Sequence, residues 1–156
     1  MLSIFGIDPG YSGAIAIYWP KTKKLEMHDM PIMLNHAGKN IIDCHALIDI
    51  LEPETANRFA VVERVGAMPG QGVSSVFRFG EGYGMLQAAI ASQKTAIHFV
   101  TPAKWKKHFG LNRDKGVSRS KAMERFPNYA QLFSRVKDDG RAEAALIALY
   151  GAEELS

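Results

Sequence analysis

The N-terminal region alternates short apolar runs with turn-forming residues. These runs predict three consecutive strands, at Leu2–Asp8, Ala14–Trp19 and Lys24–Met30. An Asp-Pro-Gly segment supplies the first turn, and Pro20–Lys23 supplies the second. The pattern therefore predicts a meander at the start of the chain.

The rest of the chain alternates helical and strand patterns. Apolar residues at helical spacing stop before Pro53, which predicts a helix over Ile42–Leu51. Phe59–Glu63 is short and almost wholly apolar, as in strands that are buried on both faces of a mixed or parallel sheet. The elements predicted after it are a helix over Val73–Ser92, a strand over Ala96–Val100, a helix that starts at Thr101-Pro102, a helix over Val117–Phe126 and a helix over Gly140–Tyr150. Five strands with helices between them indicate an α/β fold.

Glycine marks two places in this pattern. Gly66–Gly72 is rich in glycine and predicts a loop directly after the acidic end of the Phe59–Glu63 strand. Gly80, Gly82 and Gly84 lie inside a predicted helix, where each glycine costs about 1 kcal/mol relative to alanine. Three such residues indicate a packing reason, with the helix close to another backbone or to nucleic acid.

Size and composition indicate one globular domain that spans residues 1–156. The single cysteine, Cys44, has no partner for a disulfide within the chain, and a half-buried helix thiol explains it better than a nucleophile. No apolar segment approaches the roughly 18 residues of a membrane span, and no basic leader precedes an apolar core. We therefore expect a soluble protein of the cytoplasm.

Charge is mildly positive overall and unevenly distributed. The formal net charge is +3 and the isoelectric point is near 9.0, with the basic residues concentrated between Lys104 and Arg141. This distribution favours a polyanionic partner, and a well-solvated helical surface explains it equally well.

Acidic residues stand at the ends of three predicted elements. Asp8 closes the first strand, and Glu63 closes the fourth. Asp139 and Glu143 stand four residues apart at the front of the last helix, on one helical face. Mg²⁺ prefers carboxylate oxygens, and two ions about 3.5–4 Å apart can activate a water and stabilise the leaving oxygen of a phosphodiester. Each acid alone fits a turn, a helix cap or a surface ion pair, but their joint occurrence favours a metal site.

Five segments, in this order and spacing, resemble the RuvC-type Holliday junction resolvases of the ribonuclease H-like superfamily, and those of phages in particular. The matching segments are Gly6–Gly10, Val61–Val65, Phe77–Gly84, Thr101–Lys107 and Asp139–Ala144. The resemblance implies a mixed five-stranded sheet flanked by helices, and a homodimer. It also implies Mg²⁺- or Mn²⁺-dependent nicking of two strands of a four-way DNA junction, with two ions per active site.

The resemblance also assigns residues. It implies that Asp8, Glu63, Asp139 and Glu143 bind metal and act in catalysis. Asp138 competes with Asp139, because the last helix of the family usually offers two aspartates three residues apart. Lys107 is expected to place its ammonium beside the scissile phosphate. The residues expected to contact DNA are Met68, Lys104, Lys107, Arg113, Lys115, Arg119 and Lys121.

Aromatic residues and histidines receive more ordinary roles. Bacterial members of the family place an aromatic wedge after the second acid, whereas Met68 or Phe77 stands in that region here. Helix core is the favoured interpretation for Phe77 and Phe79, and Trp105 is expected to pack its helix onto the sheet. The five histidines show no spacing typical of metal ligands.

We predict a structure-selective endonuclease that resolves four-way DNA junctions with symmetric nicks and leaves 5′-phosphate and 3′-hydroxyl ends. Its partners would be junction DNA and a second copy of the chain, with no membrane and no nucleotide cofactor, in a bacterial cell or a phage-infected host. Two alternatives are another ribonuclease H-like nuclease, acting on branched DNA or RNA/DNA hybrids, and a non-catalytic junction-binding protein. A third is a sugar-kinase or actin-like fold, which the Asp8–Gly13 turn matches loosely. The length of the chain disfavours it, because such proteins use two related domains.

Overall fold

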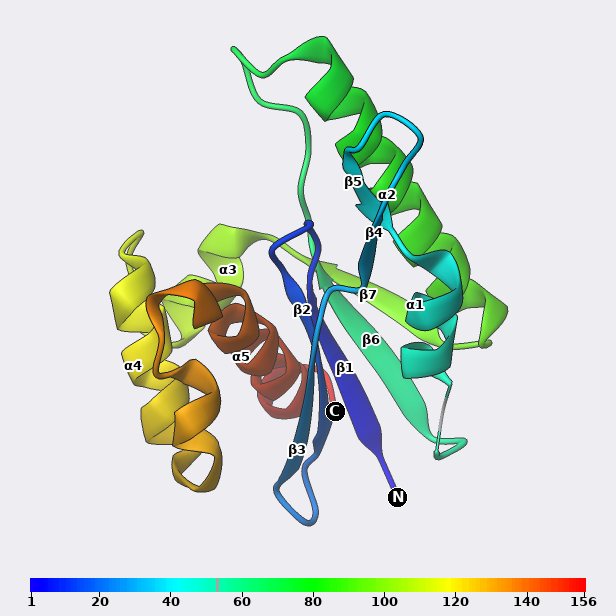
Figure 1. Cartoon of the computed structure of the whole chain (residues 1–156). Helices are drawn as coiled ribbons and strands as arrows, with labels where there is room; N and C mark the ends of the chain where they lie inside the picture. The colour runs from blue at the N-terminus through cyan, green and yellow to red at the C-terminus, as the bar shows by residue number, and fades with distance from the viewer. Residues whose placement is uncertain (53) are drawn as a thin grey trace.

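The computed structural model describes residues 1–52 and 54–156 and contains a five-stranded sheet with helices on both faces (Figure 1). The strand order is β3-β2-β1-β6-β7, with β1, β2 and β3 as an antiparallel meander and β6 and β7 parallel to β1. These strands are β1 (Ser3–Asp8), β2 (Ala14–Trp19), β3 (Lys24–Asp29), β6 (Arg58–Glu63) and β7 (Ala96–Val100). The predicted mixed five-stranded α/β fold is confirmed.

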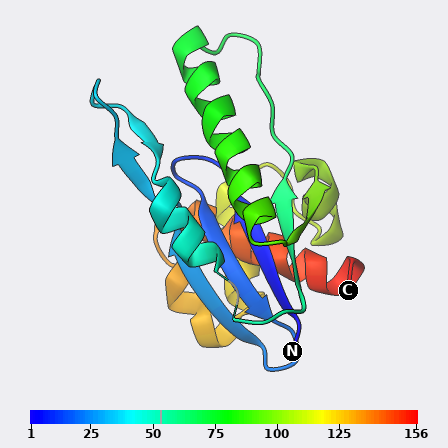
Figure 2. The same cartoon turned by 90° about the vertical axis from the view of Figure 1, so that its right-hand side faces the viewer.

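The helices divide between the two faces of this sheet (Figures 1 and 2). One face is covered by α1 (Cys44–Leu51) and α2 (Val73–Ser92), which pack against Phe5 and Ile7 of β1. The other face is covered by α5 (Asp139–Glu154), with α3 (Pro102–His108) and α4 (Lys115–Arg125) packed against α5. Because successive strand residues face opposite sides, β1 is buried on both faces, which explains its nearly continuous apolar sequence.

The helix α5 approaches the sheet very closely at Gly6 of β1. A Cβ at this position would lie 2.3 Å from the carbonyl oxygen of Ala144 and 2.3 Å from the amide nitrogen of Ala148. The backbone of α5 therefore rests directly on the backbone of β1, an approach that requires glycine. Asp8 follows Gly6 by two residues and so faces the same side of the sheet, toward α5.

Helix boundaries differ from the predicted ones by a few residues. The helix α1 ends at Leu51 as predicted, with Glu52 as its C-cap, and Pro53 lies outside the described residues. The helix α4 begins at Lys115 because Asp114 caps it through the Gly116 amide, and α5 continues past Tyr150 to Glu154. Within the described residues, no helix combines the length and hydropathy needed to cross a membrane.

Several short elements escaped prediction. The strands β4 (Ile32–Leu34) and β5 (Asn40–Ile42) form a hairpin that projects beside α2 (Figure 2), where Arg78 donates a hydrogen bond to the Asn40 carbonyl at 3.1 Å. All three residues of β4 are exposed, so no apolar alternation marks the strand. Two 3₁₀ helices, η1 (Pro127–Phe133) and η2 (Val136–Asp138), connect α4 to α5.

The helix α2 stays helical through its three glycines. A Cβ on Gly82 would lie 3.2 Å from Cδ1 of Ile42, so the predicted packing reason holds at this position. A Cβ on Gly80 or Gly84 would meet open space. These two glycines lie instead on an exposed face of α2.

Candidate metal centre

Three carboxylates from distant parts of the chain meet at one end of the sheet. Asp8 ends β1, Glu63 ends β6 and Glu143 lies near the start of α5, and one ligand oxygen of each lies within 4.8 Å of the others. Because β1 and β6 are adjacent and parallel, with Ile7 beside Val62, their carboxyl ends coincide. The expected gathering of acids is therefore confirmed for these three residues.

The start of α5 is held close to the turn between β1 and β2. A Cβ on Gly140 would lie 2.4 Å from the carbonyl oxygen of Ser12, so the helix backbone contacts the turn directly. Together with the approach at Gly6, this contact carries Glu143 toward Asp8. Gly6 and Gly140, both in the sequence motifs, thus allow the close backbone contacts that bring the acids together.

The donor set fits hard divalent cations. Glu63 is 7% exposed and Glu143 is 5% exposed, so water does little to screen the repulsion between the three carboxylates. Carboxylate oxygens are the ligands that Mg²⁺ and Mn²⁺ prefer, and the group contains no soft sulfur ligand. The arrangement can therefore hold a divalent ion between two strand ends and a helix.

The helix α3 supplies two neighbours of this acidic group. Trp105 is fully buried, and its indole nitrogen donates a hydrogen bond to Oε2 of Glu63 at 2.7 Å. Lys106 places its ammonium 4.0 Å from Oε1 of Glu143. Lys107, which the sequence analysis favoured as the catalytic cation, is exposed. The structure thus places Lys106 beside the acids. Successive residues of an α-helix are rotated by about 100°, so Lys107 points farther than Lys106 from the buried side of α3 that carries Trp105.

Asp139 lies next to this group along α5 but is not one of its members among the described residues. Its Oδ1 accepts a hydrogen bond from Nε of Arg119 at 3.2 Å, and Arg119 also donates to the Ser134 carbonyl at 3.3 Å. Asp139 and Arg119, predicted to bind metal and DNA respectively, therefore pair with each other.

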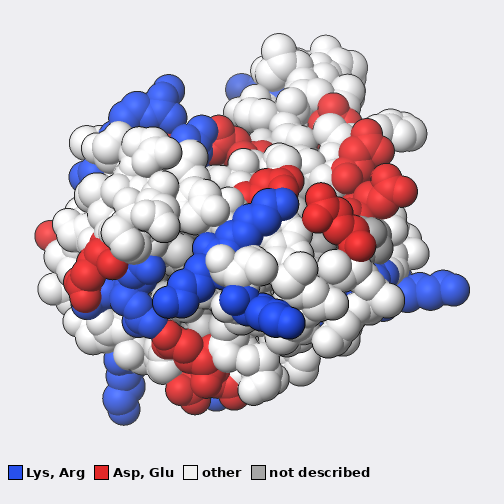
Figure 3. Space-filling model, turned by 90° about the horizontal axis from the view of Figure 1, so that it is seen from below, with Lys and Arg blue, Asp and Glu red and all other residues white. Residues whose placement is uncertain are grey.

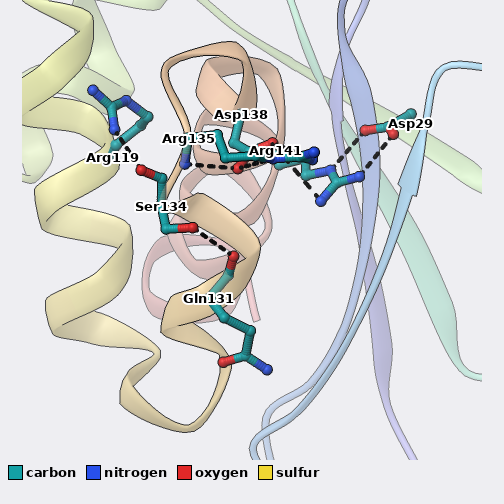
Figure 4. A network of polar contacts seen from close by, with 7 residues as sticks. All are labelled: Asp29, Arg119, Gln131, Ser134, Arg135, Asp138 and Arg141. Carbon is teal, nitrogen blue, oxygen red and sulfur yellow. Dashed lines mark hydrogen bonds and ion pairs between the residues drawn. The ribbon is translucent and has the colours of Figure 1, made fainter.

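Asp138, the other candidate ligand, belongs to a separate ionic network at the start of α5 (Figure 4). Arg135 binds its carboxylate through both side chain and backbone at 2.9–3.2 Å, and Arg141 lies 3.8 Å away. Arg141 also makes two hydrogen bonds of 2.8 Å to Asp29 at the end of β3. The network ties the front of α5 to the edge strand of the sheet.

The charges in this network shift the pKa values of both aspartates. Burial raises the pKa of Asp138, but hydrogen bonds from the side chain and backbone of Arg135 outweigh burial and hold that pKa below its ordinary value. The hydrogen bond from Arg141 lowers the pKa of Asp29. Both carboxyl groups are therefore ionised at neutral pH and pair with arginine side chains.

Comparison with known proteins gives matches among solved structures only, because no protein-family model and no curated protein sequence matches the chain. RuvC of Thermus thermophilus, in complex with a Holliday junction substrate, is 13% identical with a TM-score of 0.66, over 99% of this chain and 97% of that one. The chain has the RuvC fold. A second T. thermophilus RuvC structure is 16% identical with a TM-score of 0.62, over 96% of this chain and 93% of that one. The yeast mitochondrial Holliday junction resolvase Ydc2 is 18% identical with a TM-score of 0.51, over 93% of this chain and 75% of that one.

On this RuvC fold, the other residues predicted to contact DNA lie in varied surroundings. Met68 is 67% exposed in the loop before α2, and Lys104 and Arg113 are also exposed. Lys121 pairs with Glu124 at 3.1 Å on α4. The side chain of Lys115 lies outside the described part of the structure.

One aromatic prediction is wrong and one is incomplete. Phe77 was expected in the helix core but is 71% exposed, because it lies on the face of α2 that carries Gly80 and Gly84. Phe79 stacks on Tyr83 at 6.3 Å and is half-buried, in keeping with a packing role. Trp105 packs in the core on the α5 side of the sheet as predicted, but its hydrogen bond to Glu63 was missed.

Charge on the end of the molecule opposite the carboxylates is mixed. Seen from below in Figure 3, this end carries Asp and Glu side chains among Lys and Arg. Such a surface does not attract a polyanion uniformly.

Proposed function

We propose that this chain is a divalent-metal-dependent endonuclease that cuts four-way DNA junctions. The observation that carries the proposal is the group of three carboxylates, Asp8, Glu63 and Glu143, within 4.8 Å of one another. The fold supports the substrate class, because the matched T. thermophilus structure holds a Holliday junction substrate.

The three carboxylates are the proposed metal ligands, with Mg²⁺ as the ion and Mn²⁺ as a substitute. A pair of bound ions would activate the attacking water and stabilise the leaving oxygen. Water would form the new bond to phosphorus as the bond to the 3′ oxygen breaks, which leaves a 5′-phosphate and, after protonation of the leaving oxygen, a 3′-hydroxyl. The carboxylates come from three rigid elements, β1, β6 and α5, which limits their movement when the ions exchange. Asp139 bonds to Arg119 through Oδ1, so any contribution from Asp139 would use the remaining acceptor positions of its carboxylate.

Basic side chains near the group would place the phosphate backbone. Lys106 lies within 4.0 Å of Glu143 and keeps a positive charge where negative charge develops on the phosphate. Lys104, Lys107 and Arg113 are exposed and are proposed to contact flanking phosphates, which position DNA without reading its sequence.

We also propose that two copies of the chain associate through α2. The exposed residues Val73, Phe77, Gly80, Gly84 and Ala88 recur at spacings of three and four, and none of them is charged. Such a face suits close packing against the same face of a second helix, as in a two-fold contact. A two-fold dimer presents two equivalent sites, as symmetric nicking of a four-way junction requires.

The decisive experiment is cleavage of labelled nucleic acids by the purified protein. We expect Mg²⁺-dependent paired nicks in a mobile four-way junction, and weaker cleavage of a flap or an RNA/DNA hybrid. Glu143→Gln should abolish cleavage but keep junction binding in a gel-shift assay, because it removes a metal ligand and leaves the exposed cations unchanged.

Other outcomes would select the alternatives. A preference for the hybrid would assign the chain to another class of ribonuclease H-like nuclease. Junction binding that Mg²⁺ does not convert to cleavage, with Glu143→Gln identical to wild type, would indicate a non-catalytic binding protein.

A further inference from the structure

We propose that Trp105 is a positioning residue for the metal centre, which holds the Glu63 carboxylate in its ligating orientation through the indole N–H. The inference rests on the proposed metal-dependent function and adds a residue to it. Its basis is the buried hydrogen bond of 2.7 Å between Nε1 of Trp105 and Oε2 of Glu63.

The burial of both partners makes this bond structurally important. Trp105 has no exposed surface, so water does not solvate its N–H, and an unpaired buried donor costs about 1–3 kcal/mol. An indole donates but does not accept, and here it donates to one of the three clustered acids. An ionised carboxylate has about four acceptor positions and can therefore bind an indole N–H and a cation at the same time.

The donor itself is held rigidly. Thr101 caps α3 by accepting a hydrogen bond from the Lys104 amide at 3.3 Å, directly after β7 ends at Val100. The carbonyl of Val100 accepts a bond from the Arg64 amide at 2.7 Å, which ties the start of α3 to the residue after Glu63. The indole ring itself is buried among residues of α5.

The backbone of Glu63 is fixed separately from its side chain. The Tyr83 hydroxyl donates to the Glu63 carbonyl at 3.2 Å, and β6 pairs with β1 and β7 on its two sides. These contacts do not set the side-chain torsions of Glu63, whereas the bond from Trp105 constrains them. Hydrogen bonds that orient a metal ligand in this way typically change metal affinity or activity about 10–100-fold when they are removed.

Trp105→Phe is the direct test, because phenylalanine keeps an aromatic ring in the core and removes the N–H. We expect Mn²⁺ binding, measured without DNA by electron paramagnetic resonance, to weaken about 10–100-fold. Cleavage should need correspondingly more Mn²⁺ for half-maximal rate and should recover substantially at saturating Mn²⁺. Junction binding in EDTA should stay unchanged.

Phe133→Leu is the matched control. Phe133 is fully buried in the same cluster as Trp105, so this variant loses core packing without any change at the acids. It should bind Mn²⁺ like wild type. Unchanged Mn²⁺ affinity in Trp105→Phe, or an equal loss in Phe133→Leu, would overturn the positioning role.

A measurement on the chain with Trp105 intact tests the inference even if Trp105→Phe does not fold. The chain has two tryptophans, Trp19 and Trp105, and so two indole N–H signals in a ¹⁵N-correlated spectrum. Mg²⁺ should shift the Trp105 signal, assigned with Trp19→Phe, and leave the other in place; no shift would contradict the inference.

These results separate the inference from the proposed function. Mn²⁺ binding that depends on Trp105, in a protein that cuts no junction, would refute the function and keep the positioning role. Junction cleavage with a Mn²⁺ requirement that Trp105→Phe does not alter would refute the positioning role and keep the proposed function. Wild-type protein that binds no Mn²⁺ would refute both.

Discussion

Gly6→Ala tests how closely α5 must approach β1 for the carboxylates to meet. The new Cβ would lie 2.3 Å from two backbone atoms of α5, whereas ordinary contact begins at 3.4 Å. The helix must therefore move outward by about 1 Å, because close-packed backbone offers no rotamer that relieves the clash. Overpacking of this kind costs about 1–3 kcal/mol. For a domain of this size, each kcal/mol lowers the melting temperature by about 2–4 °C.

The same movement would reach the metal centre. Glu143 adjoins Ala144, one of the residues that the new methyl group would displace, and it would move relative to Asp8 and Glu63. A displacement of about 1 Å in a positioned group can cost about 100-fold in rate. We expect Gly6→Ala to lower both Mn²⁺ affinity and junction cleavage on the order of 10–100-fold.

Thermal unfolding and Mn²⁺ titration of Gly6→Ala would be compared with Gly66→Ala. A methyl group at Gly66 would have no atom within 4 Å, so this replacement should leave both measurements near wild type. A Gly6→Ala protein with wild-type melting temperature and Mn²⁺ affinity would show that the approach of α5 at Gly6 does not control the site.

Three further predictions concern separate parts of the molecule. Lys106→Met should slow cleavage at saturating Mg²⁺ by at least about tenfold, whereas Lys107→Met should mainly weaken junction binding; equal effects on the single-turnover rate would contradict the assignment. Asp138→Asn should cost about 1–3 kcal/mol in urea unfolding at pH 7, because Arg135 loses its buried partner. Folding lowers the pKa of the Asp138 carboxyl. The stability that the ionised carboxylate contributes is therefore fully present above the pKa of the unfolded chain, near 4, and is lost as the pH falls through the pKa of the folded protein. The difference between wild type and variant should therefore shrink toward pH 2, and a constant difference would refute the ionic role. Phe77→Asp should convert the proposed dimer to monomers in analytical ultracentrifugation without lowering the melting temperature of the monomer, because Phe77 is exposed within one chain. A dimer that persists in this variant would exclude the α2 face as the contact.

The strands and the acids at their ends could be predicted because their signals are local. A strand such as β1 must be apolar along its length when both of its faces are buried. An acidic residue at the end of such a strand is therefore easy to recognise in the sequence. The side of the sheet that α5 covers, and hence the meeting of Glu143 with Asp8, depends on long-range packing that no single segment shows. The resemblance to a family supplied that information.

Other features could not be read from the sequence, for physical reasons. The sequence analysis named Lys107 and did not single out Lys106, because both are basic and only the phase of a short helix anchored by Trp105 distinguishes their positions. Phe77 was placed in the core because apolar residues usually are buried, whereas here the exposed face of α2 is itself apolar. Asp138 and Asp139 have identical local signals, and only the tertiary positions of Arg135 and Arg119 show which cation each one meets.

The wide spacing of Asp8, Glu63 and Glu143 along the chain would also link the proposed binding of metal ions to the folding reaction. A partly folded species in which α5 has not docked presents only two of the three acids, and its affinity for divalent ions must be lower. Added Mg²⁺ or Mn²⁺ would therefore stabilise the fully assembled molecule in preference to every intermediate. In this chain the electrostatic penalty of gathering negative charge and the proposed gain from cation binding would both arise when the last helix closes onto the sheet.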